Sequence, residues 1–194
     1  MAAMVTRILV VAGSTRSDAL SKKLGRAAAK IADLNGGAST FVDLRDYAMP
    51  LYDGDLEAAE GLPDGAVRLR QLLLQHEAVL FASPEYNASI PAVLKNAIDW
   101  LSRPYAKDPG VVAWKGKVAA LLSSSPGALG GLRGLVHLRQ ILMNVGCVVI
   151  NEQFALGNAG AAFAPDGHLA DAKQSAAVQA VVQRLVHYTQ RLAN

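Results

Sequence analysis

Short apolar runs alternate with amphipathic stretches along this chain. Five runs rich in Val, Ile, Leu and Ala have the length of buried strands. They lie at residues 8–12, 40–44, 78–82, 118–122 and 147–150. Between and after them, apolar residues recur at the three- and four-residue spacing of a helix. The alternation of strand and helix predicts a parallel sheet with helices on both faces.

Helical periodicity is expected over residues 20–34, 64–76, 91–101, 132–144 and 171–191. In the first of these, an apolar stripe is predicted to face the sheet, and a basic set is predicted to project away from it. The stripe includes Leu20, Leu24, Ile31 and Leu34, and the basic set is Lys22, Lys23, Arg26 and Lys30. We interpret the basic set as a solvated helix face, because no aromatic residues are interleaved with it as in a nucleic-acid surface.

The first, third and fourth apolar runs are the most continuous, which places them at the centre of the sheet, and the more polar second run predicts an edge strand. This pattern fits one three-layer domain over residues 1–194 with strand order 2-1-3-4-5. In that order, ligands bind at the carboxyl ends of the first and third strands. Three long stretches, 45–62, 104–115 and 151–167, are expected to be irregular.

Composition narrows the class of protein. With 194 residues and 52% hydrophobic residues, the chain can bury one sizeable core. The single cysteine, Cys147, excludes an internal disulfide and suggests a reducing compartment. Residues 1–6 are too short for a signal peptide, and no apolar run approaches the ~18 residues of a membrane span. We therefore expect a cytoplasmic protein with a small-molecule partner and neither a nucleic acid nor a membrane.

The loop after the first strand has the residues of a phosphate site. Gly13 permits a tight turn, Ser14 and Ser17 offer hydroxyl groups, and Arg16 offers a charged fork. Ser21 stands near the start of a helix, where free N–H groups favour an anion. The loop lacks the glycine patterns of dinucleotide and triphosphate binders, so it suits one phosphate monoester. The alternative is a serine-rich helix cap.

Two further loops follow the third and fourth strands. In residues 84–91, Pro84 offers a flat apolar surface, and the amides of Glu85, Tyr86 and Asn87 offer donors for a ring system; the alternative is an ordinary turn with an exposed tyrosine. Residues 123–131 form a Ser- and Gly-rich loop whose backbone can approach a ring closely, or a simple linker. Together the loops predict a mononucleotide site, and a flavin fits it best.

Residues 84–100, Pro-Glu-Tyr-Asn-Ala-Ser-Ile-Pro-Ala-Val-Leu-Lys-Asn-Ala-Ile-Asp-Trp, resemble the NADPH-dependent FMN reductases of flavodoxin-like fold. The resemblance extends from about residue 8 to 150 and includes 13–16 and 130–139. The family includes quinone, chromate and azo reductases. It implies FMN as cofactor, NADPH or NADH as co-substrate, and a quinone, free flavin, azo dye or metal oxyanion as acceptor. It also implies a homodimer or homotetramer, with the flavin near the subunit boundary and residues 45–62 helping to close the site.

By this resemblance, Ser14, Arg16 and the start of the first helix hold the FMN phosphate. Pro84, Glu85, Tyr86 and Asn87 hold the isoalloxazine, and Ser125, Pro126 and Gly127 lie on its far side. The family often reads Gly-Ser-x-Arg-x-x-Ser-x-Asn, whereas Ala19 and Ser21 stand at the last two named positions here. The backbone amides of Ala19 and Leu20 remain as donors, so weaker retention of FMN is expected.

The implied reaction has two half-reactions, which predicts ping-pong kinetics. No protein nucleophile or acid is required, and none is named. The alternative is a flavodoxin-like electron carrier that binds FMN without turning over NADPH. Such carriers are typically acidic, whereas this chain has a net charge of +3. A hydrolase using Ser123, Ser124 or Ser125 would need a G-x-S-x-G elbow, which the sequence lacks.

Overall fold

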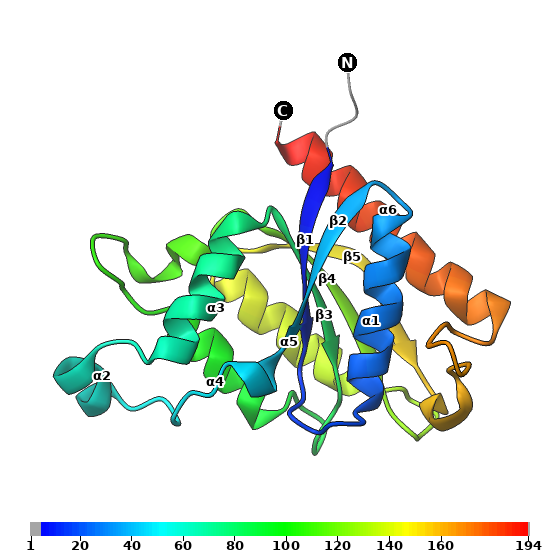
Figure 1. Ribbon diagram of the computed structural model, residues 1–194, viewed down its shortest axis with the longest axis horizontal. Helices are drawn as coiled ribbons and strands as arrows, with labels where there is room; N and C mark the ends of the chain where they lie inside the picture. The colour runs from blue at the N-terminus through cyan, green and yellow to red at the C-terminus, as the bar shows by residue number, and fades with distance from the viewer. Residues whose placement is uncertain (1–4, 194) are drawn as a thin grey trace.

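The computed structural model describes residues 5–193 and has a parallel sheet between two layers of helices (Figure 1). Five strands pair in the order β2-β1-β3-β4-β5, and each neighbouring pair is parallel. The predicted fold class and strand order are confirmed. Residues 1–4 of the segment considered as a signal peptide lie outside the described residues. The strands are β1 (Thr6–Ala12), β2 (Gly37–Asp43), β3 (Ala78–Ser83), β4 (Val118–Ser124) and β5 (Val148–Leu156).

Helices cover both faces of the sheet (Figure 1). On one face α1 packs beside α6, as predicted from the sequence, and α3, α4 and α5 cover the other. None of the helices in residues 5–193 combines the length and the apolar character that a membrane crossing needs. The helices are α1 (Leu20–Asp33), α3 (Asp64–Gln75), α4 (Ala92–Leu101), α5 (Leu132–Asn144) and α6 (Ala172–Leu192).

Two apolar cores result from the alternation of side chains along the central strands. In β1, Leu9 and Val11 pack toward α3, α4 and α5, whereas Ile8 and Val10 pack toward α1 and α6. All four side chains are buried. Burying an aliphatic side chain of this size contributes about 1.5–3 kcal/mol. The cores fix the strands and thereby the positions of the loops at their carboxyl ends.

The three stretches expected to be irregular contain regular structure. Residues 45–62 include most of the 3₁₀ turn η1 (Leu44–Asp46) and all of α2 (Gly54–Glu60). Residues 104–115 contain η2 (Gly110–Ala113), and residues 151–167 contain the second half of β5 and η3 (Ala159–Ala161). Among the described residues of α2, none is buried, so the helix leaves no apolar stripe in the sequence. β5 lies at the edge of the sheet, and the polar residues Asn151, Glu152 and Gln153 interrupt its apolar run.

Two predictions for α1 are wrong. Lys22 was expected in solvent, but its side chain is only 5% exposed, and its Nζ lies 2.6 Å from Asp43 Oδ2 at the end of β2. Leu34 was expected on the buried stripe, but it is 84% exposed, because the helix ends at Asp33 and Leu34 forms its C-cap. The first difference matters for the site, since it ties the start of α1 to β2.

Candidate functional site

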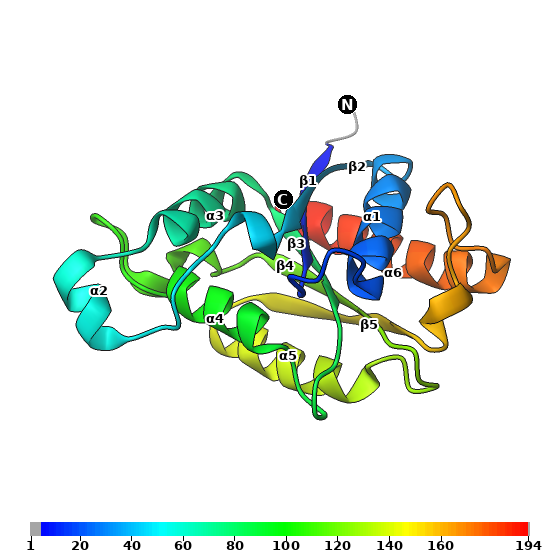
Figure 2. The same cartoon turned by 60° about the horizontal axis from the view of Figure 1, so that its bottom comes forward.

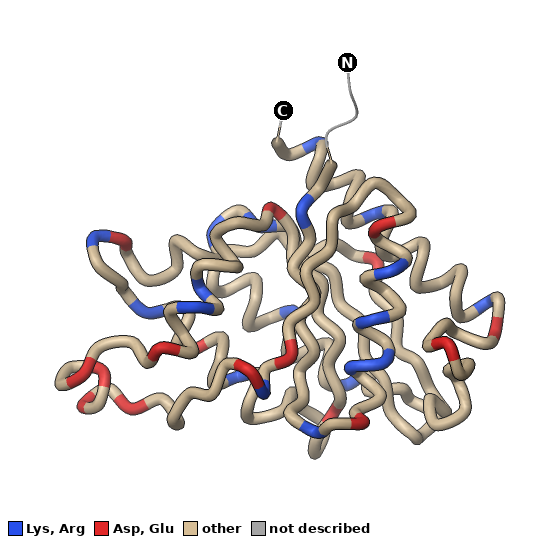
Figure 3. The backbone as a smooth tube through the Cα atoms, in the orientation of Figure 1, with Lys and Arg blue, Asp and Glu red and all other residues tan. Residues whose placement is uncertain are grey.

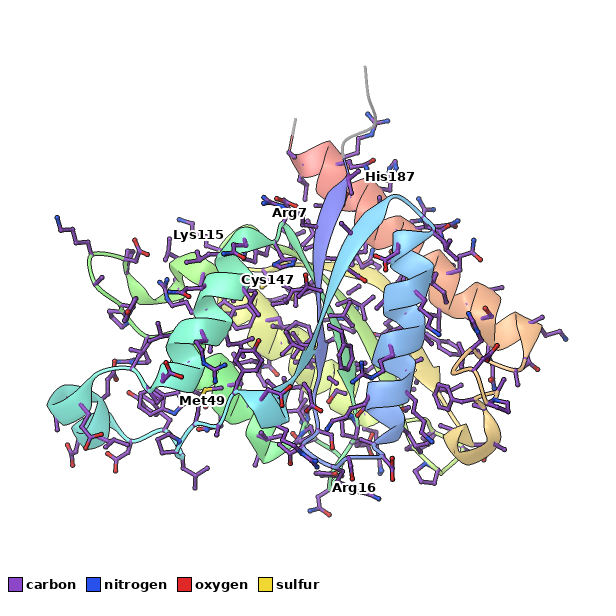
Figure 4. The ribbon with its side chains drawn as sticks, viewed as in Figure 1. Arg7, Arg16, Met49, Lys115, Cys147 and His187 are labelled. Carbon is purple, nitrogen blue, oxygen red and sulfur yellow. The ribbon has the colours of Figure 1, made fainter. Side chains whose placement is uncertain are left out.

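Three loops meet at the carboxyl edge of the sheet, which Figure 2 turns toward the viewer. We call them the phosphate loop (residues 13–19, after β1), the ring loop (84–91, after β3) and the rear loop (125–131, after β4). Figure 4 places Arg16 of the phosphate loop at this edge, and Arg7 at the opposite end of β1. The parallel strand order brings the three predicted binding segments together.

The phosphate loop lies tightly against β3 and α4. The Gly13 N–H donates to the Ala82 carbonyl at 2.9 Å. A Cβ on Gly13 would lie 3.0 Å from Leu94 Cδ2 and 3.2 Å from Ser83 Oγ, so a side chain has little room there. Ser14 is buried, and its Oγ accepts from the Arg16 N–H at 3.2 Å. Its own hydroxyl proton is therefore left to donate to another group.

The amino end of α1 has the features of an anion site. Its N-cap, Ala19, has an extended backbone and makes no side-chain capping bond. The first N–H groups of a helix have no acceptor within the helix, and the helix dipole favours negative charge beside them. Arg16 is exposed next to this end. An uncapped helix start beside an arginine fits a phosphate group.

Three buried hydroxyl groups support a polar ligand at this edge. Ser21, Ser123 and Ser124 are at most 2% exposed, and their Oγ atoms find no hydrogen-bond partner among residues 5–193. A buried polar atom without a partner costs free energy, about 1–3 kcal/mol. All three lie at the start of α1 or the end of β4, where the predicted flavin site lies. Ser123 and Ser124 are successive strand residues and point to opposite faces of the sheet, so each would meet a different part of a ligand at this edge.

The ring loop contains a two-residue turn. The Tyr86 N–H donates to the Ser89 carbonyl, and the Ser89 N–H donates back to the Tyr86 carbonyl, both at 3.0 Å. Asn87 and Ala88 between them have positive φ angles of 51° and 64°, as in a type I′ turn. The Tyr86 amide is thus engaged within the turn, which leaves the amides of Glu85 and Asn87 for the predicted ring contacts. The Tyr86 side chain is 47% exposed and faces solvent.

Glu85 joins the ring loop to α5. Its side chain is 7% exposed and pairs with Arg133, whose Nε donates to Oε1 at 2.8 Å. The Gly134 N–H donates to Oε2 at 3.1 Å. Burial of the carboxylate raises its pKa, but the hydrogen bonds from Arg133 and Gly134 outweigh burial and keep the pKa of Glu85 below its usual value. The Glu85 side chain therefore anchors the loop, and only its backbone is left for a ligand.

The rear loop is held by the end of β5. The Ser125 N–H donates to the Leu156 carbonyl at 3.2 Å, and the Ser125 carbonyl accepts from the Ala159 N–H at 3.0 Å. Pro126 and Gly127 are exposed. Gly131 has a φ of 86°, and a Cβ there would lie 3.1 Å from the Ser123 Cβ. The same Cβ would lie 3.4 Å from the Glu85 Cβ, so the end of the rear loop packs against the ring loop.

Three charged residues that hold these loops or the start of α1 were not predicted. Arg45 in η1 donates from Nε to the Thr15 carbonyl of the phosphate loop at 2.8 Å. Asp43 pairs with Lys22; burial raises its pKa, but the contacts with Lys22 and the Arg45 amide outweigh burial, so the pKa of Asp43 lies below its usual value. Arg133 holds Glu85. Each pairing joins residues far apart in sequence, so spacing gives no signal for it.

Charge is distributed unevenly around this edge (Figure 3). Lys and Arg residues follow one another along α1, whereas Asp and Glu gather around α2 and η1. The basic helix begins at the phosphate loop. The charge distribution therefore favours the anionic part of a ligand on the α1 side.

Similar proteins are known. The family model for NADPH-dependent FMN reductase matches residues 6–161. A quinone reductase of Pseudomonas putida (strain KT2440) is 39% identical over 186 residues, 95% of both chains. An NAD(P)H-dependent FMN reductase of Pseudomonas aeruginosa is 36% identical over 188 residues, 96% of both. The solved structure of a flavoenzyme NAD(P)H:(acceptor) oxidoreductase from Paracoccus denitrificans matches with a TM-score of 0.83 and 34% identity, covering 96% of this chain and 98% of its own.

Proposed function

The chain belongs to the NADPH-dependent FMN reductase family, and we propose that it carries reducing equivalents from NAD(P)H to quinones by a ping-pong mechanism. Free flavins, azo compounds and metal oxyanions are further proposed acceptors. Quinones come first, because a relative with 39% identity over almost the whole chain is named a quinone reductase. When bound, FMN supplies the centre that accepts and donates hydride.

One observation carries the proposal: an uncapped helix start and three buried, unpaired hydroxyl groups lie at the same sheet edge as the ring loop. We assign the phosphate to Ser14, Arg16, the amides of Ala19 and Leu20, and the Ser21 hydroxyl. Ser21 is 1% exposed, and its Oγ finds no hydrogen-bond partner among residues 5–193. The hydroxyl offers one donor where the family often has an asparagine, so we expect weaker retention of FMN.

We assign the flavin ring to the space between the ring loop and the rear loop. Pro84 would contact its flat face, while the amides of Glu85 and Asn87 would donate to its polar edge. Tyr86 would line the open side with its exposed ring, and Ser125, Pro126 and Gly127 would border the far side. These residues bind and orient; none of them needs to transfer a proton. An open face suits donor and acceptor molecules that visit in turn.

A homodimer or homotetramer remains part of the proposal. A groove of about 590 Å³ lies between α4 and α5, and its lining includes Ser89 of the ring loop and His137. Leu132, Val136 and Met143 of α5 are 43–62% exposed. A second copy seated there would bring the subunit boundary close to the ring loop. Sedimentation velocity tests this directly, and a monomer at micromolar concentration would contradict it. We also propose a cytoplasmic location for the protein, which the buried Cys147, free of any disulfide, supports.

The proposed function is tested by flavin retention followed by turnover. Purified protein is mixed with FMN, desalted, and examined for a protein-bound flavin spectrum. The loaded protein is then assayed with NADPH or NADH against benzoquinone, with both concentrations varied. We expect bound flavin and parallel double-reciprocal lines. No bound flavin, or intersecting lines, would contradict the cofactor assignment or the ping-pong mechanism respectively.

A further inference from the structure

Arg45 lies in η1, directly after β2, and contacts the phosphate loop. Its Nε donates to the Thr15 carbonyl at 2.8 Å, and its Nη2 donates to the same oxygen. Two donors from one guanidinium on one acceptor fix that oxygen more firmly than a single N–H does. The Arg45 guanidinium therefore binds the backbone of the phosphate loop.

The base of Arg45 is also fixed. Its backbone N–H donates to Asp43 Oδ1 at 3.0 Å, and the other carboxylate oxygen of Asp43 pairs with the buried Lys22 at 2.6 Å. Lys22 lies in the first turn of α1, immediately after Ser21. The end of β2, the turn η1 and the start of α1 are thus joined to one another. Arg45 extends this connection to the phosphate loop.

The contact with Thr15 determines the direction of the next amide. The Thr15 carbonyl and the Arg16 N–H belong to one planar, trans peptide group, so they point in opposite directions. Since Arg45 holds the carbonyl, the N–H points away from Arg45, and it donates to Ser14 Oγ at 3.2 Å. With its oxygen occupied as an acceptor, the Ser14 hydroxyl is left to donate its proton.

We propose that Arg45 is a positioning residue for the phosphate of FMN, acting through the Thr15–Arg16 peptide on the Ser14 hydroxyl. This inference rests on the proposed function and adds a residue to it. Without Arg45, the peptide is free to rotate, which turns the Thr15 carbonyl toward the anion and withdraws the Arg16 N–H from Ser14. A carbonyl oxygen beside a phosphate is repulsive, so affinity falls for the phosphorylated ligand alone.

Flavin binding to the apo-protein tests the proposal, with FMN and riboflavin as the two probes. Riboflavin has the same ring and ribityl chain but no phosphate. Arg45→Met removes the contact, and Arg45→Lys keeps the charge while losing the two-donor fork. Arg68→Met is the matched control, because Arg68 also donates to a backbone carbonyl of η1, that of Asp46, but does not touch the phosphate loop. Dissociation constants are obtained from flavin fluorescence, and urea unfolding checks that each variant folds.

We expect both Arg45 variants to raise the dissociation constant of FMN by roughly tenfold, the scale of one charge-assisted hydrogen bond. Riboflavin affinity should change by less than about twofold, and Arg68→Met should match the wild type with both probes. Wild-type FMN affinity in Arg45→Lys would overturn the positioning role, because charge alone would then suffice. Equal weakening of FMN and riboflavin would also overturn it. If the wild-type chain binds neither flavin, the proposed function itself fails.

Discussion

Replacing Glu85 by glutamine tests how the ring loop is held. Glu85→Gln removes the negative charge but keeps the size of a side chain that is 7% exposed. The pair with Arg133 is weak, about 0–1 kcal/mol, because the Arg133 side chain is 61% exposed. The charge also lies at the amino end of α5, where it contributes about 0.3–1 kcal/mol. Together with the weakened bond from Gly134, we expect a loss of about 1–2 kcal/mol in unfolding free energy.

The stability difference between the wild type and Glu85→Gln must decrease as the pH falls. The folded state lowers the pKa of Glu85 below its ordinary value of 4.5. Its contribution is therefore present above that pH and is lost as the pH falls through the folded value. Urea unfolding of the apo-protein at neutral pH and at about pH 3 measures this. Glu60→Gln, an exposed carboxylate at the end of α2, is the control. Equal stabilities at neutral pH, or a difference that persists unchanged at about pH 3, would refute the reasoning.

Three further results are expected. Gly130→Ala should lower the unfolding free energy by at least about 2 kcal/mol in urea, because φ is 62° and the new Cβ would lie 2.7 Å from backbone atoms of residues 155–157. Gly160→Ala is the control, because open space surrounds that glycine, and equal losses in the two variants would refute this. Asp43→Asn should lower the unfolding free energy by about 2–3 kcal/mol at neutral pH, because it leaves Lys22 buried without a counterion. The difference from the wild type should shrink as acid protonates Asp43 in the wild type. An unchanged unfolding midpoint at neutral pH would contradict this. Burial raises the pKa of Cys147 to about 12, so a disulfide reagent should label it at about pH 8 only after unfolding; rapid labelling of the folded protein would refute this.

The strands and long helices could be predicted because their apolar residues face a core. The helix predicted over residues 132–144 has these same bounds in α5. By contrast, α2 is held by polar contacts: Asp53 caps it, and Glu57 accepts from Arg103 Nε at 2.8 Å. Such contacts leave no periodic pattern. Lys22 was misjudged because a lysine in an amphipathic helix is normally solvated, whereas Asp43 supplies a counterion from β2.

The meeting of the three loops at one sheet edge could be predicted because each loop directly follows an apolar strand. The strand order then brings the loops together without further information. The sequence did not predict the bonds that hold the loops to other elements: Arg45 of η1 to Thr15, and Arg133 of α5 to Glu85. These depend on three-dimensional proximity alone. The sequence also showed no sign of the turn that engages the Tyr86 amide. Asn87 and Ala88 both adopt positive φ angles, and Ala88 stands where such a turn usually has glycine.

The chain is proposed to pass electrons from NAD(P)H to an acceptor through bound FMN. The most direct test mixes the FMN-loaded protein anaerobically with one equivalent of NADPH and follows the visible flavin absorption. We expect the band to bleach in the absence of an acceptor and to return when benzoquinone is added. A band that stays oxidised while NADPH remains unconsumed would contradict the reductase and favour an electron carrier.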